Sequence, residues 1–211
     1  MNFTVLFAAT FLLPSGSVSE LEPGFHGKEI QFSRRISLPK GKYFQYLHKG
    51  MVFVPSKYEG EAIFQDSEGE PIDRKQTYII HLWYPGNSIK KTRVRLDRLS
   101  RVIEGDDFAI VADSPGALPT EVAIARGISA VGHHHRGVGY NVLGNNCGHF
   151  VAWCKYGKSQ HDTQVRDMLD TYSKKFDLPN KEILVRGISN LVQSGYQDHP
   201  PALTASERRS S

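Results

Sequence analysis

The sequence predicts an α+β fold, in which an antiparallel sheet packs against helices. Strand-like segments fill the first half of the 211-residue chain and helix-like segments follow them, an order typical of α+β proteins rather than of doubly wound sheets. With 39% apolar and 23% charged residues, the chain is neither disordered nor fibrous. Its 2 cysteines exclude a disulfide-dense scaffold. At this length we expect one folded unit that buries about 70% of its unfolded surface.

The N-terminal segment, residues 1–19, is predicted to be a signal peptide. Its apolar run from Phe3 to Leu13 would reach about 17 Å as a helix, too short for a hydrocarbon core about 30 Å thick. Ser17-Val18-Ser19 supplies a small-x-small cleavage site, after which Glu20 begins the mature chain. We therefore expect a secreted protein, or one in the secretory-pathway lumen, with no transmembrane helix in the mature chain. A signal anchor and a buried N-terminal element of the fold are the alternatives.

Prolines, glycines and β-type residues divide the next stretch into a lead-in and a series of strands. Residues 20–42, with breakers such as Pro23 and Pro39, predict an irregular lead-in. Residues 55–77 are acidic and rich in turn residues, and predict an exposed loop or hairpin. Aromatic and β-branched residues predict strands over 43–54 and 78–84. Over 92–96, apolar or β-branched residues alternate with Arg93 and Arg95, which predicts a half-buried strand, and residues 106–111 are a candidate fourth strand.

Helices are predicted in the second half from caps and apolar spacing. Thr120 is the expected N-cap of a helix over 121–131, which Gly132 ends. Further helical stretches near 162–175 and 180–194, with a polar tail, make up a C-terminal extension over 159–211.

The segment from Asn145 to Phe150 is the one most indicative of chemistry. Asn145 or Asn146 is a good N-cap, which places Cys147 in the first turn of a helix that we expect to end at Gly157. Unpaired N–H groups and the helix dipole there favour the thiolate, the attacking form of a nucleophilic cysteine. The same N–H groups could hold an oxyanion. The alternative is a buried structural cysteine beside an ordinary cap.

A family signature is present at residues 145–157, which read Asn-Asn-Cys-Gly-His-Phe-Val-Ala-Trp-Cys-Lys-Tyr-Gly. This run resembles the signature of lecithin:retinol acyltransferase-like proteins, a group that includes small phospholipase and N-acyltransferase enzymes. Tyr140 fits a tyrosine that precedes the family's cysteine. The resemblance implies a permuted papain-like fold, related to NlpC-type peptidases, over residues 43–158. It also implies Cys147 as the nucleophile and Tyr140 as an oxyanion or positioning group.

The resemblance further implies a base upstream of the cysteine. The family takes it from a strand reading His-x-Gly-apolar-apolar, and His48-Lys49-Gly50-Met51-Val52 is similar. Ile79-Ile80-His81 is similar to the strand end that carries the family's second histidine. His48 is thereby implied as the general base and His81 as the group that orients it. A register in which His81 is itself the base stays open.

Two features depart from the family pattern. Gly148 stands where an acidic residue usually follows the cysteine. The two family histidines are 33 residues apart in this sequence, which makes residues 55–77 an insertion. His149 is a poor base, because two residues along a helix turn its side chain about 200° from that of Cys147. We expect it to be a structural histidine.

The remaining charged and histidine-rich segments predict no cofactor. The triple His133-His134-His135 is expected in a solvent-facing loop, because consecutive histidines cannot all face one metal ion without strain. No organic cofactor is implied, since nucleophile, base and oxyanion donors all come from the chain. The basic stripe over residues 90–101 is expected to be a solvated face, with an anionic membrane surface as its preferred partner. Nucleic acid is not expected, because no reading motif accompanies the charge.

The sequence thus predicts a thiol acyltransferase or phospholipase A. Its expected substrate is a glycerophospholipid or other acyl-lipid ester, which would form a thioester with Cys147. An NlpC-like cysteine amidase or peptidase would use the same residues and is the enzymatic alternative. A catalytically inactive binding module with the same fold is the third hypothesis, motivated by Gly148 and the insertion.

Overall fold

A computed structural model describes residues 11–12, 21, 23–37, 43–83, 91–103, 108–135 and 145–158. In chain order, the elements are β1 (Phe11–Leu12), the 3-10 turn η1 (Pro23–Phe25), β2 (Glu29–Ser37), β3 (Tyr43–Phe53), the 3-10 turn η3 (Pro55–Lys57), β4 (Tyr78–Trp83), β5 (Arg93–Arg98), α1 (Leu99–Ile103), β6 (Phe108–Val111), α2 (Thr120–Ser129) and α3 (Cys147–Tyr156).

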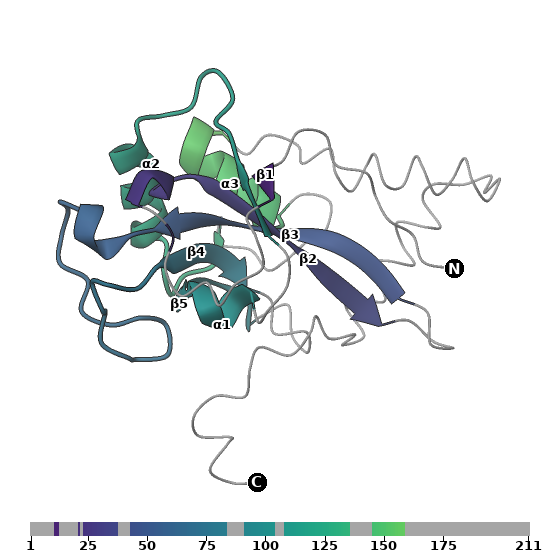
Figure 1. The fold of residues 1–211 in the computed structure, drawn as a ribbon, viewed down its shortest axis with the longest axis horizontal. Coiled ribbons are helices and arrows are strands. Elements are labelled where there is room, and N and C mark those ends of the chain that lie inside the picture. Colours follow the sequence, from purple (N-terminus) through teal and green to yellow (C-terminus); the bar gives the residue numbers. More distant parts are fainter. Residues whose placement is uncertain are drawn as a thin grey trace, which may run out of the picture.

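The strands form one antiparallel sheet in the order β1-β6-β2-β3-β4-β5, with helices packed on it (Figure 1). β4 pairs with β5 along its whole length, whereas the ladder between β3 and β4 runs only from the pair Gly50–His81 to the pair Phe53–Tyr78. The α+β prediction is therefore confirmed. The predicted strands at 43–54 and 78–84 are β3 and β4, and β5 continues two residues beyond the predicted end at 96.

The expectation of an irregular lead-in is wrong for residues 29–37, which form β2 and pair with both β3 and β6. Ile30 and Phe32 are buried and alternate with the half-buried Glu29 and Gln31, which is the period-2 pattern of a half-buried strand. The breakers Pro23 and Pro39 lie on either side of this strand rather than within it.

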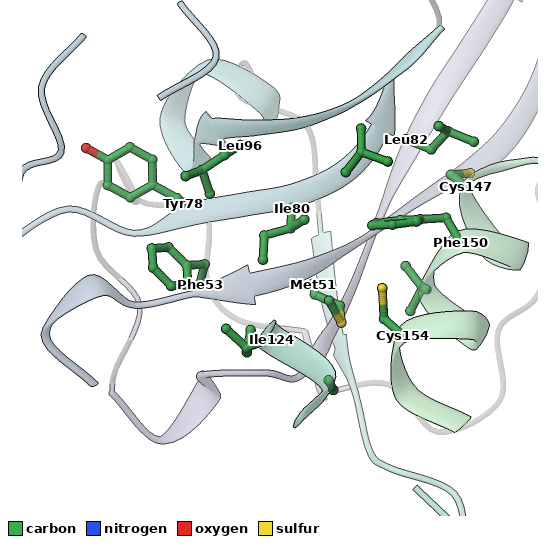
Figure 2. Close-up of a cluster of buried hydrophobic side chains, with 13 residues drawn as sticks. Met51, Phe53, Tyr78, Ile80, Leu82, Leu96, Ile124, Cys147, Phe150 and Cys154 are labelled. Carbon is green, nitrogen blue, oxygen red and sulfur yellow. The ribbon is translucent and has the colours of Figure 1, made fainter. Parts of the chain in front are cut away.

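Each face of the sheet carries a hydrophobic cluster. One face packs against α2 and α3, and we call it the α2–α3 face; the other packs against α1 and is called the α1 face. Buried members on the α2–α3 face are Met51, Phe53, Tyr78, Ile80, Leu82, Val94, Leu96, Ala123, Ile124, Cys147, Phe150, Val151 and Cys154 (Figure 2). Those of the α1 face include Ile30, Phe32, Val52, Val54, Ile79, Leu99, Val102, Ile103 and Phe108. Since strand side chains alternate, the central strands β3 and β4 contribute side chains to both clusters.

The helix carrying the family signature has the predicted ends. α3 begins at Cys147, and the side chain of its N-cap Asn146 accepts the backbone N–H of His149 at 3.0 Å. Gly157 ends the helix with a φ of 73°, a left-handed conformation that glycine adopts without strain.

The predicted start of α2 is wrong by one residue. Thr120 is already helical, its N-cap is Pro119, and no side chain caps the helix. Pro119, with φ −51° and ψ 142°, has the non-helical backbone of an N-cap but no side chain that could accept the first N–H groups of the helix.

The other end of α3 is fixed by a buried cation. The Lys155 side chain is 3% exposed, and its ammonium donates to the Gly27 carbonyl at 3.2 Å. It also pairs with Asp113, which pairs in turn with Lys28 at 2.6 Å. Because a buried ammonium without partners would be costly, these contacts tie α3 to the turn before β2 and to the segment after β6.

Several expectations concern the ends of the chain. Phe11–Leu12, within the predicted signal peptide, form β1 and pair with Ala109 and Ile110 of β6. Cleavage after Ser19 would remove this edge strand and leave the sheet β6-β2-β3-β4-β5. Tyr140 and the extension over 159–211 lie outside the described residues. Over the part of the chain that is described, no helix is long and apolar enough to cross a bilayer.

Candidate active site

The structure brings the two predicted histidines together. His48 on β3 and His81 on β4 are both buried, and His48 Nε2 lies 2.9 Å from His81 Nδ1. Gly50 is the β3 residue paired with His81. His48 lies two residues before Gly50 on β3, so its side chain is on the same face of the sheet as that of His81. The ring of Phe32 on β2 packs beside His48 with a centroid separation of 5.0 Å.

Gly50 makes the approach of the histidines possible. A Cβ at this position would lie 2.4 Å from Ile79 Cγ2 and 3.2 Å from His81 Cβ, closer than packed carbons allow. The backbone at Gly50 is an ordinary strand, so glycine is required for space rather than for conformation. This gives a physical reason for the glycine in the His-x-Gly pattern: it leaves room for the second histidine on the neighbouring strand.

Asp97 on β5 extends the histidine pair. Its Oδ2 lies 3.0 Å from His81 Nε2, and because a carboxylate only accepts, His81 donates this hydrogen bond. Arg95 donates to both carboxylate oxygens, from Nε at 2.7 Å and from a terminal nitrogen at 2.8 Å. Burial alone would raise the pKa of Asp97, but the hydrogen bonds from His81 and Arg95 and the charge of Arg95 outweigh it and hold the pKa well below its ordinary value.

Sequence reasoning missed Asp97. The strand predicted at 92–96 ended before Asp97, although its alternation already placed Arg93 and Arg95 on one face. Continuing that alternation adds Asp97 to the same face, so the signal was present in the sequence. What the alternation does not reveal is the register that sets Arg95 opposite His81.

The 55–77 loop is joined to this site. Its residue Glu68 forms an ion pair with Arg95, whose guanidinium also lies 4.9 Å from the ring centroid of Trp83. Ser67 fixes the loop against β5, since its backbone N–H donates to the Leu96 carbonyl and its hydroxyl accepts the Leu96 N–H. Burial would lower the pKa of Arg95, but hydrogen bonds and charges from Asp97 and Glu68 raise it. The 55–77 loop is therefore attached to the charged residues behind the histidines.

Cys147 occupies the first position of α3, a helix that packs on β3 and β4. Its side chain is buried on the α2–α3 face, at the end of that cluster with Leu82 and Phe150 (Figure 2). His81 precedes Leu82 on β4, and by strand alternation it faces the other side of the sheet, as does His48. The structure thus places the cysteine on one face of the β3–β4 pair and the two histidines on the other.

The remaining polar groups of the signature helix have structural contacts. His149 Nδ1 lies 2.8 Å from the Asn146 side-chain oxygen, which holds this histidine on the N-cap. This geometry agrees with the expectation that His149 is structural. Cys154 is fully buried, and burial raises the pKa of its thiol, so it stays protonated at neutral pH.

The triple histidine is less exposed than expected. His135 is buried, and its ring packs against Phe150 and Trp153 with centroid separations of 5.4 Å each. His134 Nδ1 lies 2.9 Å from a guanidinium nitrogen of Arg93. The expectation of a solvent-facing loop is therefore wrong for His135, because the aromatic face of α3 covers it. Over the described ranges, no three metal-ligating side chains come together.

Comparison with protein families gives a match for part of the chain. A family model described as lecithin retinol acyltransferase (LRAT) matches residues 63–160, which contain His81, Asp97 and Cys147. Residues 63–160 are assigned to an LRAT-like family. The family indicates acyltransferase-type or phospholipase-type chemistry. His48 precedes the LRAT-like segment, so its place in the site rests on its hydrogen bond to His81. A search of curated proteins found no match to the chain.

The low pKa of Asp97 leads to a prediction for acid unfolding. Above the ordinary Asp pKa of about 4 the carboxylate stabilises the folded state in full, and this stabilisation is lost as the pH falls toward the lower pKa of the folded protein. The free energy of unfolding of the wild-type chain should therefore fall more steeply below about pH 4 than that of Asp97→Asn. Urea unfolding at a series of acidic pH values measures both slopes. Equal slopes would contradict a paired Asp97 carboxylate.

Proposed function

We propose that this chain is a thiol acyltransferase or phospholipase A that acts on glycerophospholipid esters. The observation that carries the proposal is the buried pair of His48 and His81, hydrogen-bonded in series to Asp97, on the two strands against which the cysteine helix packs. A cysteine nucleophile needs a base of this kind. The LRAT-like match supports an acyl-lipid rather than a peptide as the substrate.

In the proposed reaction, His48 takes the proton of the Cys147 thiol, and the thiolate attacks the carbonyl carbon of the ester. The tetrahedral intermediate collapses with cleavage of the C–O bond, and His48 returns the proton to the leaving lysophospholipid oxygen. The product on the protein is a Cys147 thioester. Water, an alcohol or an amine then attacks the thioester, His48 accepts its proton, and the cysteine is released as a thiol.

The oxyanion of the intermediate is assigned to the first turn of α3. The helix N-terminus combines backbone N–H groups with the positive end of the dipole, so the N–H groups at Cys147 and Gly148 are the proposed donors. Tyr140 is proposed as a further oxyanion or positioning group. Gly148 carries no carboxylate, so no negative charge follows the nucleophile in sequence.

The thiol is proposed to reach its base around the rim of the β3–β4 ladder. This ladder ends at Gly50 and His81, and His48 lies beyond the last pair. Where a ladder ends, backbone no longer separates the two faces, so side chains from both faces can approach each other there. The position of Cys147 beside Leu82, next in sequence to His81, supports this route.

A substrate panel tests the proposal. The full chain is incubated with a short-chain diacyl phosphatidylcholine and with peptides, and the release of fatty acid from the first and the cleavage of amide bonds in the second are measured. We expect release from the phospholipid ester by the wild type and by Cys154→Ala, the matched loss of the other cysteine, whose thiol is buried and protonated. Cys147→Ala should release none.

The other outcomes separate the alternative functions. Cleavage of the amides without cleavage of the ester would make the protein an NlpC-like amidase or peptidase. Cleavage of neither, by a chain with an intact circular dichroism spectrum, would leave an inactive binding module and overturn the proposal. A lipid surface is the proposed partner, while the signal peptide and secretion stay predictions.

A further inference from the structure

Five side chains form a continuous polar chain from the insertion to the proposed base. We call it the charge network: Glu68, Arg95, Asp97, His81 and His48. Exposure falls along it, from 22% for the Glu68 side chain through 18% for Arg95 to 6% for Asp97. Its first member belongs to the 55–77 loop and its last to β3. The network therefore connects a surface loop to the buried histidine pair.

The hydrogen-bond chemistry of the network fixes which ring nitrogens carry protons. The Asp97 carboxylate can only accept, so His81 Nε2 must carry a hydrogen. In a neutral His81 the other nitrogen, Nδ1, is then bare and accepts the bond from His48 Nε2–H at 2.9 Å. His48 Nε2 is thus the protonated nitrogen, and Nδ1 is the one that can accept a proton.

Resting on the function proposed above, we infer that Asp97 is a positioning residue of the site. It sets the His81 tautomer and thereby makes Nδ1 the proton-accepting atom of His48. The insertion takes part in this positioning, because Glu68 holds the Arg95 guanidinium that holds Asp97. Asp97, Arg95 and Glu68 do not need to touch substrate for this role.

The Arg95 contact is suited to this task. A guanidinium binds both carboxylate oxygens in one plane, and this bidentate contact fixes the orientation of Asp97 as well as its charge. Only one carboxylate oxygen also meets His81. A lysine at position 95 would supply the charge without the fork and would leave the carboxylate free to rotate.

The same arrangement accommodates the charge that forms during the reaction. When the thiol S–H bond breaks and His48 Nδ1–H forms, His48 becomes an imidazolium that donates through Nε2 to His81. His81 stays hydrogen-bonded to the Asp97 carboxylate at 3.0 Å. The negative carboxylate lies one imidazole ring from the new positive charge, which favours the ion pair over the neutral thiol.

The tautomers can be read directly by nuclear magnetic resonance on the full wild-type chain labelled with ¹⁵N in histidine. We expect both His48 and His81 to carry the proton on Nε2 at neutral pH and to show an unprotonated Nδ1. Asp97→Asn should lose the single His81 tautomer, and Asp97→Glu should restore it. A wild-type spectrum with the His81 proton on Nδ1 would overturn the inference, and this readout does not depend on the folding of any variant.

Fatty acid release tests the functional part of the inference. Asp97→Asn should lower the rate about tenfold or more. A general base contributes about 10²–10⁴-fold to the rate, and a base whose tautomer is no longer fixed loses part of that contribution. Glu68→Gln should lower the rate less than Asp97→Asn does, by about two- to fivefold, as expected for the loss of one partly exposed ion pair. Glu70→Gln, the same change at an exposed position of the same loop, should leave the rate unchanged.

The outcomes distinguish this inference from the proposed function. The expected tautomers in a wild type that releases no fatty acid would support the assignment of Asp97 and overturn the proposed function. A wild type that releases fatty acid, with a folded Asp97→Asn variant of full rate, would overturn the inference alone. Equal rates for Glu68→Gln and Glu70→Gln would remove the insertion from the positioning role.

Discussion

Replacing His48 with asparagine is expected to lower fatty acid release by about 10²–10⁴-fold. Asparagine keeps a polar side chain that can contact His81 but has no group that accepts the thiol proton. Alkylation of Cys147 by iodoacetamide at neutral pH should slow as well, because no base remains to take the thiol proton and the reactive thiolate forms less often. Both rates are measured on protein shown to be folded by circular dichroism.

A second buried histidine provides the control. His26 is 7% exposed, and its Nδ1 accepts the Val54 N–H at 3.0 Å, outside the charge network. His26→Asn removes a buried imidazole from the same domain, so it should lower stability but leave the rate per folded molecule close to that of the wild type. A folded His48→Asn variant with the wild-type rate would exclude His48 as the base.

Replacing Gly50 with alanine should damage both stability and the site. The new Cβ would lie 2.4 Å from Ile79 Cγ2 and 3.2 Å from His81 Cβ, so β3 and β4 must shift apart. Overpacking of this kind costs about 1–3 kcal/mol in the free energy of unfolding. A displacement of His81 by about 1 Å can lower the rate about 100-fold. Urea unfolding and fatty acid release measure the two effects separately.

Gly24→Ala is the matched control for this substitution. A Cβ at Gly24 meets no atom within 4 Å, and the φ of Gly24 is not in the left-handed region. This variant should keep the stability and the rate of the wild type. If Gly50→Ala did the same, the close packing that brings His48 and His81 together would be contradicted.

The parts of the fold that were predictable from sequence are those set by local chemistry. Asn146 and Gly157 delimit α3 because capping depends on residues within one turn of the helix. β3 and β4 were predictable because their aromatic and β-branched residues mark strands without reference to any partner. β2 was not predicted because the flanking breakers Pro23 and Pro39 are typical of irregular segments, and the alternation around Ile30 and Phe32 is too short to outweigh them.

The candidate site was predictable only where a family pattern named its residues. His48 and His81 are 33 residues apart, and their hydrogen bond depends on the register between β3 and β4. Asp97 and Glu68 join the site through contacts across strands and from a loop, which no local pattern specifies. The face of the sheet occupied by Cys147 was likewise set by the packing of α3, not by its own neighbours in sequence.

The central claim is that Cys147 carries the acyl group as a thioester. Its most direct test is intact-mass analysis of the full chain after brief incubation with a diacyl phosphatidylcholine, followed by peptide mapping. One added acyl group, removed by neutral hydroxylamine and located on the Cys147 peptide, is the result predicted. A folded protein that releases fatty acid while no acyl group is ever found on Cys147 would contradict the account.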